Sequence, residues 1–276
     1  MKFKDDLYPL PFRGQQIKNL SLNGDEIHFD GFVIYAYQSD EDLHELIAIF
    51  GKTYLSKYGH LPTNVRLITR RVPVDSKTQA EVYWLEAKVG DKVEHRFAFW
   101  PIATVVPTLE NLIEWNARAQ EIYPEDGVYG KGGLKADGGR HLNYVLAEVA
   151  DSFQFGMDYL PTIAKKAAYL WQRIGAAQSF QNGNKRTAMV AMLVFLHVNG
   201  YEFMNKPGLK DELVKMSRRV ALSMEHTDPE KEDATQEKID IEDIEKYILQ
   251  NVELNFDNSP WKVLESMRDT PTNDSK

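Results

Sequence analysis

The chain has 276 residues, of which 43% are hydrophobic and 27% are charged, a balance that is typical of globular proteins and argues against a disordered chain. Its net charge of −8 disfavours non-specific binding to nucleic acid. The sequence contains no cysteine, so disulfides, thiolate metal sites and cysteine nucleophiles are excluded, and a reducing compartment is favoured.

The sequence shows no signal for a membrane or for export. The longest apolar run, residues 189–198, is interrupted by His197 and is far shorter than the roughly 20 residues that a membrane-spanning helix needs. Residues 1–10 lack the apolar core of a signal peptide. We therefore expect a cytoplasmic location, no membrane partner and no direct nucleic-acid binding.

The first 104 residues carry patterns that are typical of a small α+β domain. Residues 27–37 and 65–68 are rich in β-branched and aromatic side chains and predict strands. Residues 81–89 and 92–100 alternate apolar and polar residues around Gly90-Asp91, which predicts a β-hairpin with a two-residue turn. Between the first two strands the sequence predicts an amphipathic helix over residues 40–58, with one face formed by Leu43, Leu46, Ile47 and Phe50.

The predicted hairpin is unusually aromatic, with Trp84, Phe97, Phe99 and Trp100. We expect one of its faces to pack on the helical half of the chain, and a partner-binding face is the alternative. The domain could dock a target protein or cover a site elsewhere in the chain, and the sequence leaves this role open.

From residue 105 to residue 250 the apolar periodicity is helical, so the chain as a whole is expected to be mainly α. Thr108 is a good N-cap for a helix that buries Leu109, Leu112 and Ile113, and Pro161 suits a helix start. Helices are predicted over residues 108–119, 141–153, 161–175, 184–199, 209–224 and 241–250. Residues 127–139 form a glycine-rich loop and residues 226–238 a charged loop. Residues 251–276 are expected to be a C-terminal tail that is partly disordered.

One segment, residues 178–188, carries recognisable chemistry. Gly183 allows a ligand to approach the backbone, and Asn184 is a good N-cap for the apolar helix that follows. The first N–H groups of a helix have no partner within it and attract anions, and Lys185 and Arg186 add two positive charges there. The segment predicts a phosphate site, although helix starts of this composition also occur where only water binds.

This segment resembles the motif of the Fic/Doc (death-on-curing) family, His-x-Phe-x-Asp/Glu-Gly/Ala-Asn-Gly/Lys-Arg. The matching residues are Phe180, Gly183, Asn184, Lys185 and Arg186. The Lys before the Arg, followed by Thr187-Ala188, is similar to the Doc branch rather than to typical adenylyl (AMPylation) transferases. Similarity extends to residues 108–119, 159–164, 193–196 and 199–201, so the resemblance covers about residues 105–250.

The resemblance implies a Fic/Doc-type helical domain that uses ATP or another nucleoside triphosphate with Mg²⁺. Such a domain transfers a phosphoryl or nucleotidyl group to a hydroxyl of a target protein, as a toxin does, and an antitoxin or an intramolecular inhibitor restrains it. By the same resemblance, Gly183, Asn184, Lys185 and Arg186 hold the phosphates and Phe180 anchors the motif in the core. A flap that includes Gly139, Arg140 and His141 docks the target.

Two residues depart from the family motif where the chemistry takes place. Gln178 stands at the position of the His that acts as general base, and a carboxamide cannot take up a proton near neutral pH. Asn182 stands at the position of the acidic Mg²⁺ ligand and offers only a neutral oxygen. Two hypotheses therefore stay open, a Doc-like transferase with a degenerate active site and a catalytically inactive nucleotide- or partner-binding module.

Two histidines are secondary candidates. His141 follows the glycine-rich loop and is either a substitute base or an ordinary surface residue. His197 lies among apolar residues and is expected to be a partly buried structural residue.

Overall fold

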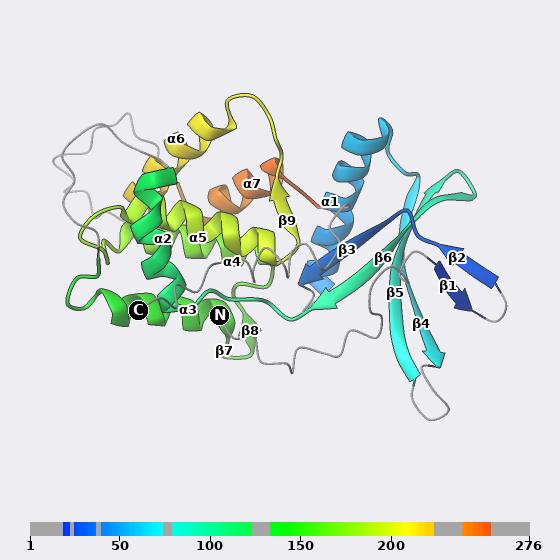
Figure 1. Cartoon of the computed structure of the whole chain (residues 1–276), viewed down its shortest axis with the longest axis horizontal. Helices are drawn as coiled ribbons and strands as arrows, with labels where there is room; N and C mark the ends of the chain where they lie inside the picture. Colours follow the sequence, from blue (N-terminus) through cyan, green and yellow to red (C-terminus); the bar gives the residue numbers. More distant parts are fainter. Residues whose placement is uncertain are drawn as a thin grey trace, which may run out of the picture. The chain divides into compact units, whose positions relative to one another are not determined.

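The computed structural model describes residues 19–22, 25–36, 40–73, 79–122, 133–223 and 239–254 (Figure 1). The chain divides into two compact units, which are described separately. The first consists of residues 1–35, 46–102 and 254–276, and the second of residues 36–45 and 103–253. These units differ from the predicted division at residue 104, because the start of helix α1 (Asp40–Tyr58) belongs with the helical unit. Most of the predicted tail, residues 255–276, lies outside the described residues.

The first unit is built on a four-stranded sheet. The strand order is β3 (Gly31–Ala36), β6 (Lys92–Ile102), β5 (Gln79–Val89) and β4 (Asn64–Pro73), and β1 (Asn19–Leu22) pairs separately with β2 (Asp25–His28). The predicted hairpin turn at Gly90-Asp91 is confirmed, with Gly90 at a φ of 60°. The predicted single strand over residues 27–37 is instead two strands, because Asp30 turns the chain and its N–H and carboxylate both bond the backbone of Arg96.

Aromatic side chains from the hairpin form the core of this unit on both faces of the sheet. On one face the ring of Phe97 packs edge-on against Phe50 of α1, with 5.2 Å between centroids. On the other face Trp84 packs against Phe29 and Phe32. Trp84, Phe97 and Phe99 are at most 4% exposed, so the alternative of a partner-binding face is wrong for these three residues.

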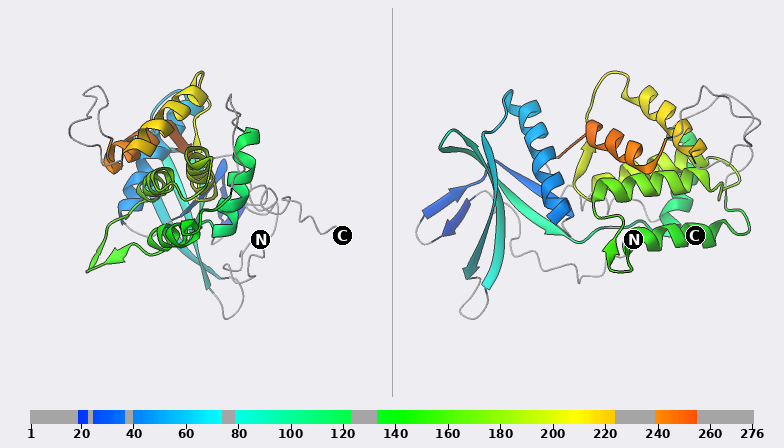
Figure 2. Two further views of the ribbon diagram at one scale, coloured as in Figure 1. Left: turned by 90° about the vertical axis from the view of Figure 1, so that its left-hand side faces the viewer. Right: turned by 180° about the vertical axis from the view of Figure 1, so that it is seen from behind.

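The second unit is a bundle around two adjacent helices, α4 (Ile163–Ala176) and α5 (Asn184–Val198), which Figure 2 (left) shows end-on. Helices α3 (Gly138–Ala150) and α7 (Ile241–Asn251) pack against α4, α2 (Leu109–Ile122) packs against α5, and α6 (Leu209–Leu222) packs against both. All six predicted helices of this region are therefore confirmed. Ile163, Ala167, Leu170 and Ile174 of α4 are fully buried, as predicted, whereas Ile113 of α2 is 39% exposed and its predicted burial is wrong.

Two short strand pairs complete the second unit. β9 (Tyr201–Phe203) pairs with β10 (Val252–Leu254), and β7 (Phe153–Gln154) forms a hairpin with β8 (Met157–Asp158). The predicted helix over residues 141–153 ends at Ala150, because this projecting hairpin follows it (Figure 2). Among the helices in the described part of the chain, none is long and apolar enough to cross a bilayer.

Candidate functional site

The segment that resembles the family motif forms a loop between α4 and α5. Helix α5 begins at Asn184, and Gly183 is its N-cap with a left-handed φ of 79°. A Cβ atom on Gly183 would lie 3.0 Å from Nδ2 of Asn116, so both the backbone angle and the crowding favour glycine. The prediction that Asn184 is the N-cap is wrong, because its side chain bonds back into the loop and not to the helix.

Asn184 closes this loop, called the motif loop (residues 177–183) from here on. Its Oδ1 accepts the N–H of Phe180 at 2.8 Å, and its Nδ2 donates to the carbonyl of Phe180 at 2.9 Å and to Oε1 of Gln178 at 3.3 Å. The side chain of Phe180 is fully buried. The side-chain amide of Asn184 and the buried ring of Phe180 thus hold the motif loop in place. The burial of Phe180 agrees with the anchoring role predicted for it.

A residue that the sequence analysis missed, Asn116 of α2, fixes the same loop from the other side. Its Nδ2 donates to the carbonyl of Asn182 at 2.8 Å and to Oγ1 of Thr187 at 2.9 Å, and its Oδ1 accepts the N–H of Gly133 at 3.2 Å. Asn116 is only 5% exposed. The sequence could have pointed to Asn116 by its position one turn after Leu112, which places a polar residue on the apolar face of the helix.

The backbone just before α3 pairs with the motif loop as a short antiparallel bridge between Leu134 and Phe180. Lys135 donates its N–H to the carbonyl of Ser179 at 2.9 Å, and Gln181 donates its N–H to the carbonyl of Gly133 at 2.8 Å. Residues 133–135 are called the flap strand below. They are the described end of the predicted glycine-rich loop, whose residues 127–132 lie outside the described residues.

Helix α3 begins at Gly138, one residue before the predicted end of the glycine-rich loop at Gly139. Gly139, Arg140 and His141 therefore lie in the first turn of a helix rather than in a loop. Arg140 forms an exposed ion pair with Asp137. Docking of a target at these three residues stays a prediction.

Positive charge gathers where the motif loop enters α5. Lys185 is exposed, whereas Arg186 is 6% exposed and its guanidinium lies against Gly183, since a Cβ on that glycine would be 3.8 Å from Nη2. The first hydrogen bond of α5 runs from the N–H of Thr187 to the carbonyl of Gly183. The preceding N–H groups have no acceptor within a helix, so this corner favours an anion.

Comparison with known proteins agrees with this geometry. Residues 106–196 match the model of the Fic/DOC family. This part of the chain is therefore similar to a Fic/Doc domain. The matched residues begin just before α2 and extend through most of α5, so they include Asn116, the flap strand, the motif loop and the cationic corner.

The chain is also similar to a curated protein. The chain is 42% identical over 48 residues to Toxin Doc of Mycolicibacterium smegmatis (strain ATCC 700084 / mc(2)155). This match covers 17% of the present chain and 37% of the toxin, so the chain spans just over a third of the relative's length. No solved structure matches the chain significantly.

Gln178 and Asn182 stand where the Fic/Doc motif has its base and its metal ligand, and both side chains accept hydrogen bonds from nearby residues of the segment. Gln178 is exposed, has a left-handed φ of 50°, and its Oε1 accepts a hydrogen bond from Asn184. Oδ1 of Asn182 accepts the N–H of Gly183 at 2.7 Å. Since an amide oxygen has two lone pairs, Asn182 keeps one site for a cation. The described residues contain no cluster of three His, Asp or Glu that could hold a metal.

The two histidines do not join the motif loop. His141 lines a cavity whose wall residues include neither Gln178 nor Asn182, so its role as a substitute base stays a prediction. His197 of α5 is partly buried and lies 3.3 Å from a carboxylate oxygen of Glu202, which agrees with its predicted structural role.

Proposed function

We propose that the Fic/Doc domain of this chain is a Doc-like transferase that uses ATP or another nucleoside triphosphate to move a phosphoryl or nucleotidyl group onto a protein hydroxyl. The observation that supports this proposal best is the cationic corner at the start of α5, with Lys185 exposed and the guanidinium of Arg186 against Gly183. The similarity to Toxin Doc supports a toxin-like role with an antitoxin as partner.

Each residue of the corner has a distinct task in this proposal. The N–H groups from Asn184 onward and the charge of Lys185 would bind phosphate oxygens, and the planar guanidinium of Arg186 suits two oxygens of one phosphate. Asn182 would offer a single neutral oxygen to Mg²⁺, so most ligands of the cation would come from the nucleotide and from water. The target would dock beside Gly139, Arg140 and His141.

Gln178 makes the proposed enzyme slow. It can orient a target hydroxyl by a hydrogen bond, but it cannot accept the proton of that hydroxyl. The loss of a general base typically costs about 10²–10⁴ in rate. Phosphoryl transfer depends mainly on positioning and charge stabilisation, which the intact corner would supply. We therefore expect weak activity rather than none.

A second candidate function is a binding module that holds a nucleotide or a protein partner without reaction. The observation that favours it is that the side-chain oxygens of Gln178 and Asn182 both accept hydrogen bonds from the protein itself, from Asn184 and from Gly183. In this arrangement the two amides stabilise the loop, which is a sufficient reason for their presence without catalysis.

The transferase and the binding module predict different effects on activity when the family residues are restored at positions 178 and 182. We would incubate the full chain, Gln178→His, Asn182→Asp and the double variant with bacterial lysate and with ATP labelled at the α- or γ-phosphate. Label transfer by the unaltered chain that rises about 10²–10⁴-fold in the double variant supports the transferase. No label with any of the four proteins contradicts the transferase and supports the binding module.

Nucleotide binding is tested separately by calorimetric titration of the full chain with ATP, with and without Mg²⁺. We expect saturable binding that weakens in Lys185→Ala, because the exposed ammonium adds a positive charge to the corner. Lys92→Ala removes another exposed lysine, at the start of β6, and is the matched control. The absence of heat at millimolar ATP, or equal weakening by both changes, would contradict the phosphate site.

A further inference from the structure

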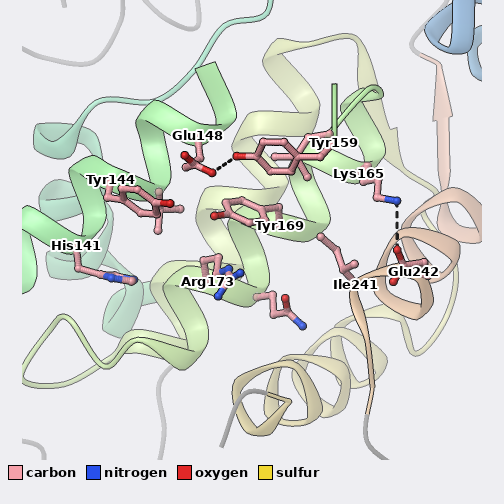
Figure 3. A pocket seen from close by; sticks show the side chains of 12 residues that line it. His141, Tyr144, Glu148, Tyr159, Lys165, Tyr169, Arg173, Ile241 and Glu242 are labelled. Carbon is pink, nitrogen blue, oxygen red and sulfur yellow. Dashed lines mark hydrogen bonds and ion pairs between the residues drawn. The ribbon is translucent and has the colours of Figure 1, made fainter. Parts of the chain in front are cut away.

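A cavity of about 450 Å³ lies among α3, α4 and α7 in the second unit (Figure 3). This volume is within the usual range for sites that hold small molecules. Its wall residues include His141, Tyr144 and Glu148 from α3 and Tyr169 and Arg173 from α4, and none of them belongs to the motif loop. The cavity therefore lies apart from the motif loop, and it shares only His141 with the proposed docking site for the target.

At one end of this cavity the charged groups are already paired with each other. Glu148 accepts a hydrogen bond from the hydroxyl of Tyr159. Lys165 lies 3.3 Å from a carboxylate oxygen of Glu242 and 3.9 Å from one of Glu245. Figure 3 shows the Glu148 and Lys165 pairs away from His141 and Arg173. The charged groups at this end of the cavity therefore already have partners within the protein, and no ligand is required to pair with them.

At the other end a buried polar atom has no hydrogen-bond partner. Nε2 of His141 is inaccessible to solvent and makes no hydrogen bond. The guanidinium of Arg173 lies over the ring of Tyr169, 5.1 Å from its centroid, and adds a positive charge. A buried nitrogen without a partner is unfavourable, so a ligand that supplies the missing hydrogen bond would be stabilised here.

The middle of the cavity is aromatic. Figure 3 shows the rings of Tyr144 and Tyr169 between the paired end and the His141 end. Burial raises the pKa of Tyr169 above its ordinary value, so its hydroxyl stays protonated and can donate a hydrogen bond. Flat aromatic walls favour a ligand with a planar ring.

We propose that this cavity binds a small planar-ring compound that carries a carboxylate or a phosphate group. The anionic group lies at His141 and Arg173, and the ring lies beside Tyr144 and Tyr169. A cationic ligand is disfavoured, because Arg173 is positive and both carboxylates of the wall, Glu148 and Glu242, are already hydrogen-bonded or ion-paired.

The proposal is tested by calorimetric titration of the full chain with 4-hydroxybenzoate and with phenyl phosphate, which distinguishes the two anionic groups. Benzyl alcohol has the ring without the charge, and acetate and inorganic phosphate have the charge without the ring. We expect saturable binding of at least one ring anion, and at least tenfold weaker binding of all three comparison compounds. No saturable heat with either ring anion, or equal binding of benzyl alcohol, overturns the proposal.

Two variants locate the bound compound. His141→Ala removes the nitrogen that lacks a partner, and Tyr144→Ala removes a ring that is 59% exposed and contributes little to the core. Each change should raise the dissociation constant at least tenfold. Phe155→Ala, at a fully exposed ring outside the cavity, is the matched control.

Thermal melting of each variant shows whether it is folded, and Tyr144→Ala alone decides the question if His141→Ala is not. An unchanged dissociation constant in the folded variants overturns the proposal. Titrations are repeated with saturating ATP, which should leave the constant unchanged because the cavity contains no motif residue. Competition by ATP would overturn the assignment of a separate site, and it would leave the proposed transferase intact.

Discussion

Gly138 and Gly139 are neighbours at the start of α3, but only one of them touches the motif loop. A Cβ on Gly138 would lie 2.1 Å from the carbonyl oxygen of Ser179, which is backbone and cannot turn away. A Cβ on Gly139 would meet only side-chain carbons of Leu134 and Leu109, at 3.6 and 3.7 Å. The first glycine is therefore required by close packing, whereas the second is not.

We expect Gly138→Ala to lower the melting temperature and to weaken ATP binding, since the flap strand must move away from the motif loop. Gly139→Ala should be neutral or should stabilise by up to about 1 kcal/mol, because alanine favours the helix. Thermal unfolding and ATP titration of the two variants test this. Equal effects of the two changes would mean that the contact at Ser179 is unimportant.

Asn116 shows where residue-level inference from the sequence stops. Its helix was predicted from periodicity, but the pattern cannot tell that its amide binds the carbonyl of Asn182 and the N–H of Gly133. Those partners are 66 and 17 residues away in the sequence. The buried position of Phe180 could be predicted, because it depends on the local motif, whereas the phosphate-holding role of Gly183 stays a prediction.

At the scale of elements, three segments of the second unit meet at Glu45. This residue of α1 accepts a hydrogen bond from the hydroxyl of Tyr201 of β9, and it is close to Thr162, the N-cap of α4. Burial raises the pKa of Glu45 from 4.5 to about 7, and the nearby carboxylates of Asp42 and Glu245 add to the effect. The meeting point is therefore most favourable when Glu45 is protonated.

The raised pKa predicts a specific dependence of stability on pH. In the unfolded chain Glu45 loses its proton near pH 4.5, whereas in the folded chain it keeps the proton up to about pH 7. The stabilisation is fully present below pH 4.5 and is lost as the pH rises to 7, by about 3 kcal/mol at most. Glu45→Gln should reduce this loss in melting curves between pH 4.5 and 7.5, and an unchanged slope would contradict the raised pKa.

The elements themselves were largely predictable, because helices of the second unit bury regular apolar stripes such as that of α4. The short strands were not predictable. β9 and β10 have three residues each and come from distant parts of the chain, and β7 and β8 have two each. Segments of this length carry no measurable periodicity, and their pairing depends on the packing of the helices around them.

At the scale of the whole molecule, the helical unit is not a continuous stretch of sequence. It includes residues 36–45, and its strand β9 pairs with β10, which begins at Val252. A helical domain limited to residues 105–250, as predicted from the sequence, would lack both residues 36–45 and β10. The sequence pattern does not assign residues 36–45 to the helical unit, because residues 40–58 form one continuous helical pattern.

Because the helical unit includes these two segments, we expect a fragment of residues 105–250 to be less stable than the same helices in the full chain. The fragment lacks β10 and the Glu45 contact to Tyr201. Its helical circular dichroism should melt at a lower temperature, and its ATP binding should be weaker. A melting temperature equal to that of the full chain would show that residues 36–45 and β10 do not contribute to the helical unit.

The left-handed backbone at Gln178 bears on the cost of replacing this residue by histidine. A non-glycine residue in this conformation costs about 1–3 kcal/mol, and the cost arises from the Cβ atom that glutamine and histidine share. An exchange between the two therefore leaves the main-chain conformation and its cost unaltered. Glutamine and histidine codons differ by one base, and so do those of asparagine and aspartate. Two point mutations would thus separate this sequence from the full family motif, without any reshaping of the chain around them.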